Sequence, residues 1–228
     1  MADSLLDRVL YRDRLMLVID KPAGIPVHAG PGGGPNLEAG FDALRFGLPK
    51  PPALAHRLDR DTSGCLVLGR HPKALRRLAR LFSVGRVGKV YWAIVTGAPD
   101  KPSGTIDLAL RKTSTKTGGW RMVADAADGK PAVTTWRTLG TSDGLSWLEL
   151  RPRTGRTHQV RVHCAALGCP VLGDPVYGSA ARGDLPPLYL HSRAVTLPLY
   201  PKKDPVTATA APPPHMQAAL TACGWDGS

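Results

Sequence analysis

Two carboxylates stand close together in the segment HRLDRDTSG, residues 56–64, where Asp59 and Asp61 alternate with basic side chains. Glycoside hydrolases break a glycosidic bond with such a pair of carboxylates, and the spacing here does not exclude that chemistry. Asp61 directly precedes the turn-forming residues 62–64, whose hydroxyls and backbone favour local hydrogen bonds. We therefore expect Asp61 to serve as a turn or cap acid that holds the loop.

Nearby histidines raise a second chemistry, that of a metal-dependent hydrolase. His56 adjoins the two aspartates in sequence, and His158 and His163 supply further imidazoles. These two are five residues apart, however, whereas the helical HExxH site needs a spacing of four. We therefore expect no metal. Cysteine ligands are not indicated either, because no CxxC pair occurs, and we expect four buried free thiols at Cys65, Cys164, Cys169 and Cys223.

The charge of the chain favours a polyanionic partner. Its 228 residues include 30 Lys and Arg against 18 Asp and Glu, which gives a net charge of +12 and a pI near 10.0. Nucleic acid is the first candidate for such a balance, although a basic protein without that partner would share it. Neither a membrane-spanning apolar run nor a secretory signal is present in the sequence, so we expect a cytoplasmic protein.

The elements that must position these residues are mostly strands. Apolar and β-branched runs bounded by turn residues predict extended segments at 15–28, 65–70, 87–97, 132–140 and 145–152. The first run is interrupted by a turn at Pro22 and Gly24 and resumes up to His28, and the last two runs form an antiparallel hairpin. This pattern predicts an α+β fold with a large mixed, mainly antiparallel β-sheet flanked by helices and loops.

Helical periodicity appears in two places. Residues 71–83 carry an apolar stripe opposite several arginines, which predicts a helix with a basic outer face; such a face is usually only solvated, so it supports RNA binding without deciding it. Residues 157–170 predict a second helix, with Thr157 as its N-cap and Gly168 as its stop. Arg161 falls in the first turn of this helix.

No linker divides the chain. We therefore expect one domain over residues 8–205, followed by an Ala- and Pro-rich tail, residues 206–228, that is loosely attached.

Several long motifs agree with one family at once. The segment HRLDRDTSG, the run KVYWAIVTG and the segment RPRTGRTHQVRVHCAALGCPVLGDPVYG occur in the order and spacing of RluA-type pseudouridine synthases, and DKPAGIPVH is similar to that family's first motif. The resemblance extends over roughly residues 8–200. It implies a pseudouridine synthase catalytic domain, hence an isomerase that breaks the N1 glycosidic bond of a uridine in RNA, turns the uracil and rejoins it through C5. No cofactor is implied.

The resemblance also implies roles for individual residues. Asp59 would be the catalytic aspartate, as a nucleophile or as a base. Arg161 would pair with Asp59 and keep it ionised, because a nearby positive charge lowers the pKa of a carboxyl group. Tyr91 would stack on the extruded uracil and assist proton transfer, and Arg57 would fill the gap that the flipped nucleotide leaves. Further RNA contacts are expected from His56, Arg156, His158 and Gln159.

Without the family, each of these residues also has an ordinary structural interpretation. Arg161 would cap a surface acid, Tyr91 would be a buried strand residue, and Arg57 would neutralise the neighbouring aspartates. A third class of function, a non-catalytic RNA-binding protein, would require charge and aromatic side chains but no reactive carboxylate. An enzyme and a binding protein differ in one test, because only the enzyme loses turnover when Asp59 is changed.

The expected partner is RNA, ribosomal or transfer, with no membrane, no obligate protein partner and a monomeric state. The region of resemblance begins within about ten residues of Met1, so we expect no separate N-terminal S4-type RNA-binding domain of the kind that many relatives carry. The resemblance is therefore to a short form, in which target choice depends on the catalytic domain itself.

Overall fold

The first predicted apolar runs form two buried antiparallel strands, β2 (Met16–Lys21) and β4 (Ser63–Gly69). Lys21 lies opposite Gly64 in this pair. Because of that register, the turn after β2 and the loop before β4 lie at the same end of the two strands. The expected second extended piece ending at His28 is wrong, since residues 22–29 form turns and bends, as their Pro and Gly content favours.

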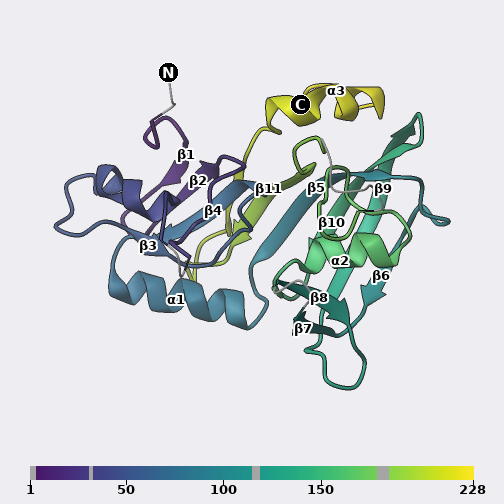
Figure 1. The fold of residues 1–228 in the computed structure, drawn as a ribbon. Helices are drawn as coiled ribbons and strands as arrows, with labels where there is room; N and C mark the ends of the chain where they lie inside the picture. Colours follow the sequence, from purple (N-terminus) through teal and green to yellow (C-terminus); the bar gives the residue numbers. More distant parts are fainter. Residues whose placement is uncertain (1–3, 31–32, 115–118, 179–184) are drawn as a thin grey trace. The chain divides into compact units, whose positions relative to one another are not determined.

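The computed structural model describes residues 4–30, 33–114, 119–178 and 185–228 (Figure 1). These residues belong to two compact units. Unit 1 comprises Met1–Lys89 and Ser192–Ala211, and unit 2 comprises Val90–His191 and Pro212–Ser228. Two of the boundaries fall inside strands, which is why no linker in the sequence indicates them. The domain limits 8–205 stay a prediction.

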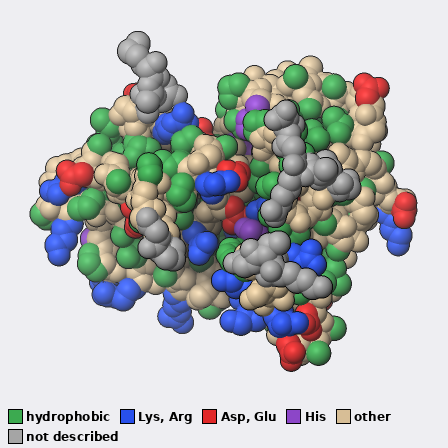
Figure 2. All heavy atoms as spheres, in the orientation of Figure 1, with side chains coloured by type: hydrophobic (Ala, Val, Ile, Leu, Met, Phe, Trp, Pro, Cys, Tyr) green, Lys and Arg blue, Asp and Glu red, His purple; other side chains and the backbone are tan. Residues whose placement is uncertain are grey.

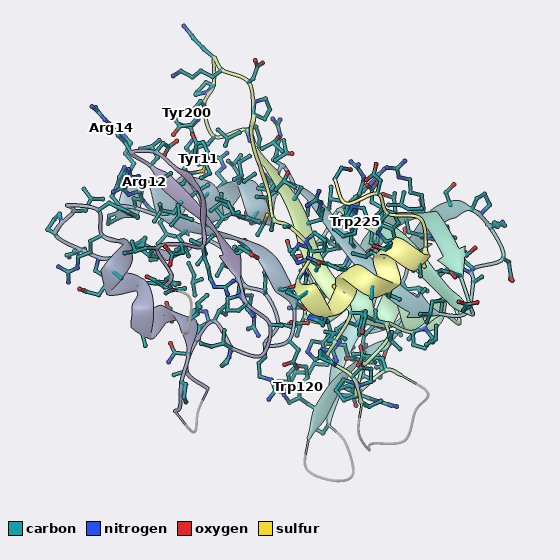
Figure 3. The ribbon with its side chains drawn as sticks, turned by 90° about the horizontal axis from the view of Figure 1, so that it is seen from above. Tyr11, Arg12, Arg14, Trp120, Tyr200 and Trp225 are labelled. Carbon is teal, nitrogen blue, oxygen red and sulfur yellow. The ribbon has the colours of Figure 1, made fainter. Side chains whose placement is uncertain are left out.

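Unit 1 is built on the strand order β1-β2-β4-β11, with β3 paired to β4 and β12 paired to β11. The bounds of the four further strands are β1 (Val9–Arg12), β3 (Ala53–Leu54), β11 (Leu190–Leu197) and β12 (Val206–Thr209). A 3-10 helix, η1 (Leu37–Leu44), and the predicted helix α1 (Pro72–Ser83) complete the unit. Tyr11 and Tyr200, both labelled in Figure 3, donate hydrogen bonds to the carboxylate of Asp13 and so join β1 to the segment after β11.

Helix α1 packs closely on β4. Its N-terminus is capped by His71, whose Nδ1 accepts a hydrogen bond from the Ala74 amide at 3.3 Å. A Cβ atom at Gly69 would lie 2.8 Å from Cα of Leu75, so only glycine allows this approach of helix and strand. The predicted helix over residues 71–83 is therefore confirmed, with its apolar stripe against the sheet.

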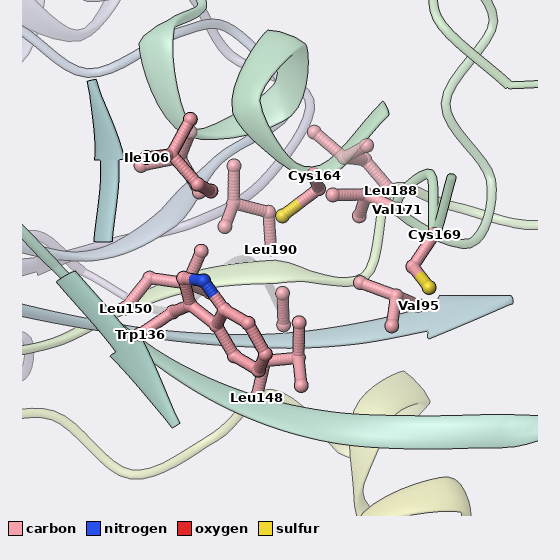
Figure 4. Packing of buried hydrophobic residues seen from close by; sticks show 12 residues of the cluster. Val95, Ile106, Trp136, Leu148, Leu150, Cys164, Cys169, Val171, Leu188 and Leu190 are labelled. Carbon is pink, nitrogen blue, oxygen red and sulfur yellow. The ribbon is translucent and has the colours of Figure 1, made fainter. Parts of the chain in front are cut away.

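Unit 2 contains the strand order β5-β10-β9-β6 and a separate hairpin, β7-β8. The larger group consists of β5 (Gly88–Thr96), β6 (Ser103–Asp107), β9 (Val133–Ser142) and β10 (Leu145–Pro152), and the hairpin of β7 (Leu110–Ser114) and β8 (Trp120–Ala124). The predicted hairpin of β9 and β10 is confirmed. Helix α2 (Gln159–Ala166) covers a core of twelve buried residues, ten of which are labelled in Figure 4.

The C-terminal segment is packed into the structure, and the loose attachment expected for residues 206–228 is wrong. Strand β12 pairs with β11, and helix α3 (Pro214–Ala222) buries Met216 and Leu220 in a cluster with Trp92 and Trp147. The apolar side chains of this short segment find partners far away in sequence, which outweighs its turn-rich composition. The four cysteines are buried free thiols, as predicted.

None of the described helices is long and apolar enough to cross a membrane.

Candidate active site

A buried lysine that the sequence analysis did not single out, Lys21, ties the first motif to the HRLD segment. Its side chain is fully buried, and its Nζ donates hydrogen bonds to the carbonyl oxygens of Pro22 and Arg60, each at 2.8 Å. The Arg60 carbonyl also accepts a hydrogen bond from the Gly24 amide at 3.0 Å. Lys21 and Gly24 therefore both bind the Arg60 carbonyl, and these bonds hold the turn DKPAG against the loop before β4.

Burial and the nearby carboxylates act in opposite directions on the pKa of Lys21. Burial lowers the pKa of Lys21 from 10.5 to about 8, while Asp61, Asp59 and Asp20 act in the opposite direction. Lys21 is therefore mostly protonated at neutral pH, and its ammonium group lies within electrostatic range of both aspartates of the HRLD segment. A lysine at the end of a buried strand is the only signal of this role in the sequence.

The two aspartates of the segment have different surroundings. Asp61 is bound in bidentate fashion by the guanidinium group of its neighbour Arg60, at 3.0 and 3.1 Å. Its predicted partners were the groups of residues 62–64, whereas its side-chain hydrogen bonds come from Arg60. Asp59 is half-buried, and its carbonyl accepts a hydrogen bond from the Thr62 amide at 3.3 Å.

His56 fixes the start of the HRLD segment. Its Nε2 accepts a hydrogen bond from the Val67 amide at 3.0 Å, and its ring stacks on Phe82 of α1 with centroids 4.3 Å apart. Burial, assisted by the charge of Lys89, lowers the pKa of His56 to about 3. The ring is therefore a neutral anchor, and the predicted RNA contact of His56 stays a prediction. The next residue, Arg57, is exposed.

In unit 2, Arg161 is held by a residue that the sequence analysis did not name as a site residue, Asp174. Arg161 Nε and Nη2 donate to the two carboxylate oxygens at 2.7 and 2.8 Å, and both side chains are buried. Burial acts to raise the pKa of Asp174, but the hydrogen bonds from Arg161 and from two backbone amides, those of Val176 and Tyr177, outweigh it and lower that pKa. Asp174 is thus an ionised carboxylate that orients the Arg161 guanidinium group.

A chain of aromatic contacts continues from Arg161 to the hairpin. The guanidinium group lies 5.2 Å from the ring centroid of Tyr177, whose hydroxyl accepts a hydrogen bond from the Met122 amide at 2.9 Å. The same hydroxyl lies 2.9 Å from Nδ1 of His158, and the His158 ring stacks on Trp120, which Figure 3 labels on β8. His158, predicted to contact RNA, therefore lies between two aromatic side chains.

His158 also corrects the predicted start of α2. The N-cap position belongs to His158, in a left-handed conformation with φ of 53°, and not to Thr157. The turn is stabilised by Gln159, whose Oε1 accepts from the Arg156 amide and the Thr154 hydroxyl, and whose Nε2 donates to the Val133 carbonyl and the Thr134 hydroxyl. The buried Gln159 amide thus fixes the turn that precedes α2, although no side chain caps the helix itself.

The other predicted site residues of unit 2 are partly exposed. Arg156 is exposed, and its Nε donates to the Pro131 carbonyl at 3.0 Å. Tyr91 of β5 lies opposite Leu150 of β10. Its side chain packs against the core that α2 covers, so Tyr91 and α2, which carries Arg161, lie on the same face of the sheet. The RNA contacts predicted for Arg156, His158 and Gln159 stay predictions, and the Gln159 amide already makes four hydrogen bonds within the protein.

The predicted residues therefore fall into two groups. Asp59, Arg57 and His56 belong to unit 1, whereas Tyr91, Arg161 and the RNA-contact residues 156–159 belong to unit 2. The pairing of Arg161 with Asp59 stays a prediction. Among the residues that the structure describes, no three His, Cys, Asp or Glu side chains are grouped to hold a metal ion.

Comparison with known proteins assigns the chain to a family. Residues 15–166 match the family model described as RNA pseudouridylate synthase. An uncharacterised RNA pseudouridine synthase of Zymomonas mobilis is 49% identical over 210 residues, which cover 92% of this chain and 95% of the relative. An uncharacterised RNA pseudouridine synthase of Synechocystis is 34% identical, covering 93% and 67% of the two chains.

Comparison of the fold with solved structures supports the same family. The solved structure of human RNA pseudouridylate synthase domain containing 4 matches with a TM-score of 0.80 and 27% identity, over 96% of this chain and 94% of that one. This similarity confirms the predicted α+β class and its large, mainly antiparallel sheet. The chain belongs to the RNA pseudouridylate synthase family, whose enzymes are isomerases.

Proposed function

We propose that this protein isomerises specific uridines in structured ribosomal or transfer RNA to pseudouridine, with Asp59 as the catalytic carboxylate. The observation that carries the proposal is the junction of Lys21 with the HRLD segment. A fully buried cation that binds the Arg60 carbonyl fixes the backbone one residue after Asp59, so this carboxylate projects from a rigid segment. Catalytic groups need such pre-organisation, because a misplaced group loses much of its effect.

The reaction needs an anionic group near C1′ of the target nucleotide. Breaking the N1–C1′ bond develops positive charge on the ribose, which a carboxylate relieves by attack on C1′ or by removal of a neighbouring proton. After the uracil turns and the C1′–C5 bond forms, C5 loses its proton and N1 gains one, so atoms and electrons balance without an oxidant or a reductant. We assign the first role to Asp59.

The remaining roles follow from the placement of the other side chains. Arg161, oriented by Asp174, would present its guanidinium group to Asp59, and Tyr91 would stack on the extruded uracil from the face that α2 shares. Arg57, exposed on the anchored loop, would occupy the space that the flipped nucleotide leaves. We further propose a cytoplasmic protein that acts without a cofactor or an obligate protein partner.

The test compares Asp59→Asn with Asp61→Asn. The first change keeps the size of the side chain and removes its charge, so it should abolish pseudouridine formation while RNA affinity stays within a few-fold. The second should lower the rate only in part, because Asp61 holds the loop. The substrates are identified by mapping pseudouridines in total RNA of cells with and without the gene. Transcripts that contain the sites lost in the deletion strain then serve as substrates in vitro.

Three outcomes would contradict the proposal. Near wild-type turnover of Asp59→Asn would remove Asp59 from the mechanism. Complete inactivity of a folded Asp61→Asn variant would favour the two-carboxylate glycosidase scheme. Tight RNA binding with no pseudouridine lost in the deletion strain would favour a non-catalytic RNA-binding protein.

A further inference from the structure

Helix α1 and the turns beside it carry a concentrated positive charge. Residues 70–89 contain seven Lys and Arg and no Asp or Glu, although the whole chain has 30 of the former against 18 of the latter. More than half of the net charge of +12 thus comes from these twenty residues. Lys and Arg side chains gather below α1 on the face that Figure 2 shows.

Four of these residues form one stripe along the helix, which we call the α1 basic face: Lys73, Arg76, Arg77 and Arg80. Their spacing of three or four residues places them on one side of the helix, over a length of about 10 Å. All four are exposed, whereas Ala74 and Leu78 on the opposite side are buried. The face therefore points away from the sheet on which α1 packs.

The α1 basic face has no negative counterpart within the described part of the chain. None of its four side chains makes an ion pair with a described residue, whereas Arg45, Arg111 and Arg137 each bind a carboxylate. Like charges four residues apart, as in the pairs 73/77 and 76/80, destabilise a helix, and no acidic residue stands in its first turn. An external partner with negative charge would relieve this repulsion.

We propose that the α1 basic face binds the phosphate backbone of the substrate RNA outside the target nucleotide, and so contributes to the choice of RNA. The inference rests on the proposed function. Guanidinium groups bind phosphate through paired hydrogen bonds, and a row of them one helical turn apart can follow successive phosphates. Contacts of this kind position the RNA without reading its bases.

The experiment compares three triple variants of the full chain. R76Q/R77Q/R80Q removes three charges from the α1 basic face. R45Q/R111Q/R137Q removes three charges from ion-paired arginines, so both variants have the same net charge. R76K/R77K/R80K keeps the charges of the face. The affinity for a transcribed RNA stem-loop is measured from roughly 50 mM to 200 mM KCl, the range over which phosphate contacts change affinity strongly.

The glutamine variant of the α1 basic face should bind about tenfold more weakly than the wild type and reduce the slope of log K against log salt by about 2 to 3, as expected for three lost phosphate contacts. The matched control should keep most of the slope, and the lysine variant all of it.

An equal slope for the glutamine variant and the matched control would overturn the inference, because the charge would then act only through the net charge of the protein. It would also be overturned if the glutamine variant lost binding to anionic vesicles but kept its affinity for RNA. Both results leave pseudouridine formation by the wild type intact, whereas failure of the proposed function would appear as no pseudouridine formation at all.

Discussion

Nζ of Lys21 and the carbonyl oxygen of Arg60 lie 2.8 Å apart, although the two residues are 39 positions apart in sequence. This hydrogen bond joins the two N-terminal motifs, and it does so with a cation that is fully buried. A buried charge is retained at a cost in stability, which usually indicates that its position matters for function. The arrangement leads to predictions about stability as well as activity.

Lys21 should make stability depend on pH on the alkaline side. Its pKa in the folded protein, about 8, lies below the ordinary value of 10.5, so the unfolded chain binds the proton more strongly between these values. The free energy of unfolding should therefore rise with pH across this window, by about 3 kcal/mol. Urea denaturation of the wild type and Lys21→Met isolates this contribution. The prediction would be contradicted if the free energies of unfolding of the two proteins differed by the same amount at the lower and the upper pH of this window.

His56 should make stability depend on pH on the acid side. Its pKa of about 3 in the folded protein lies below the ordinary 6.5, so the unfolded chain takes up a proton first as the pH falls. The wild type should lose about 2 kcal/mol relative to His56→Gln between neutral pH and a pH roughly two units below 6.5. The glutamine oxygen can accept the Val67 amide without titrating in this range. If the free energy of unfolding fell by the same amount in both proteins over this pH range, the prediction would be refuted.

Asp174→Asn should destabilise the protein and impair the reaction, because it leaves the buried Arg161 guanidinium group without its counter-charge. Breaking a buried ion pair from one side costs about 3 kcal/mol or more. The matched control is Asp125→Asn, which breaks the exposed pair with Arg111 and should have a much smaller effect. Denaturation with urea measures both. Equal losses in the two variants would mean that the Arg161–Asp174 pair has no special role in the fold.

Arg57→Ala should slow the reaction much more on a structured stem-loop than on an oligonucleotide whose target uridine is unpaired. The reason is that only the structured substrate must be unstacked, at a cost of a few kcal/mol, before the base can leave the helix. Arg60→Ala is the control, because Arg60 is also exposed in the same loop but binds Asp61. The rates on both substrates are compared under single-turnover conditions. Equal losses on both would show that Arg57 serves the carboxylates and not the flipped base.

The strands that carry the motifs were predictable because burial on both faces leaves a continuous apolar run. β4 is buried along its whole length, and the central part of β5 likewise. The hairpin of β7 and β8 was missed, since most of its residues are exposed and only Leu110 and Met122 are buried. A strand of that kind is defined by its partner, which the local sequence does not encode.

Asp59, Tyr91 and Arg161 could be named from the sequence because the resemblance to the family implies a role for each, and these roles stay predictions. The contacts of Lys21 and Asp174 could not be named, because they depend on partners at Arg60 and Arg161 that only the fold brings close. The RNA contact expected of Gln159 stays a prediction, and the sequence did not indicate that its side-chain amide makes four hydrogen bonds inside the protein.

The interleaving of the two units along the chain has a consequence during translation. Unit 1 begins with the first residues but needs Ser192–Ala211 to be complete, and unit 2 ends only with Pro212–Ser228. Neither unit can therefore finish folding while the ribosome is still making the middle of the protein. Strands β2 and β4 must wait for β11 and β12, and during that interval their apolar side chains stay exposed to chaperones and to other nascent chains.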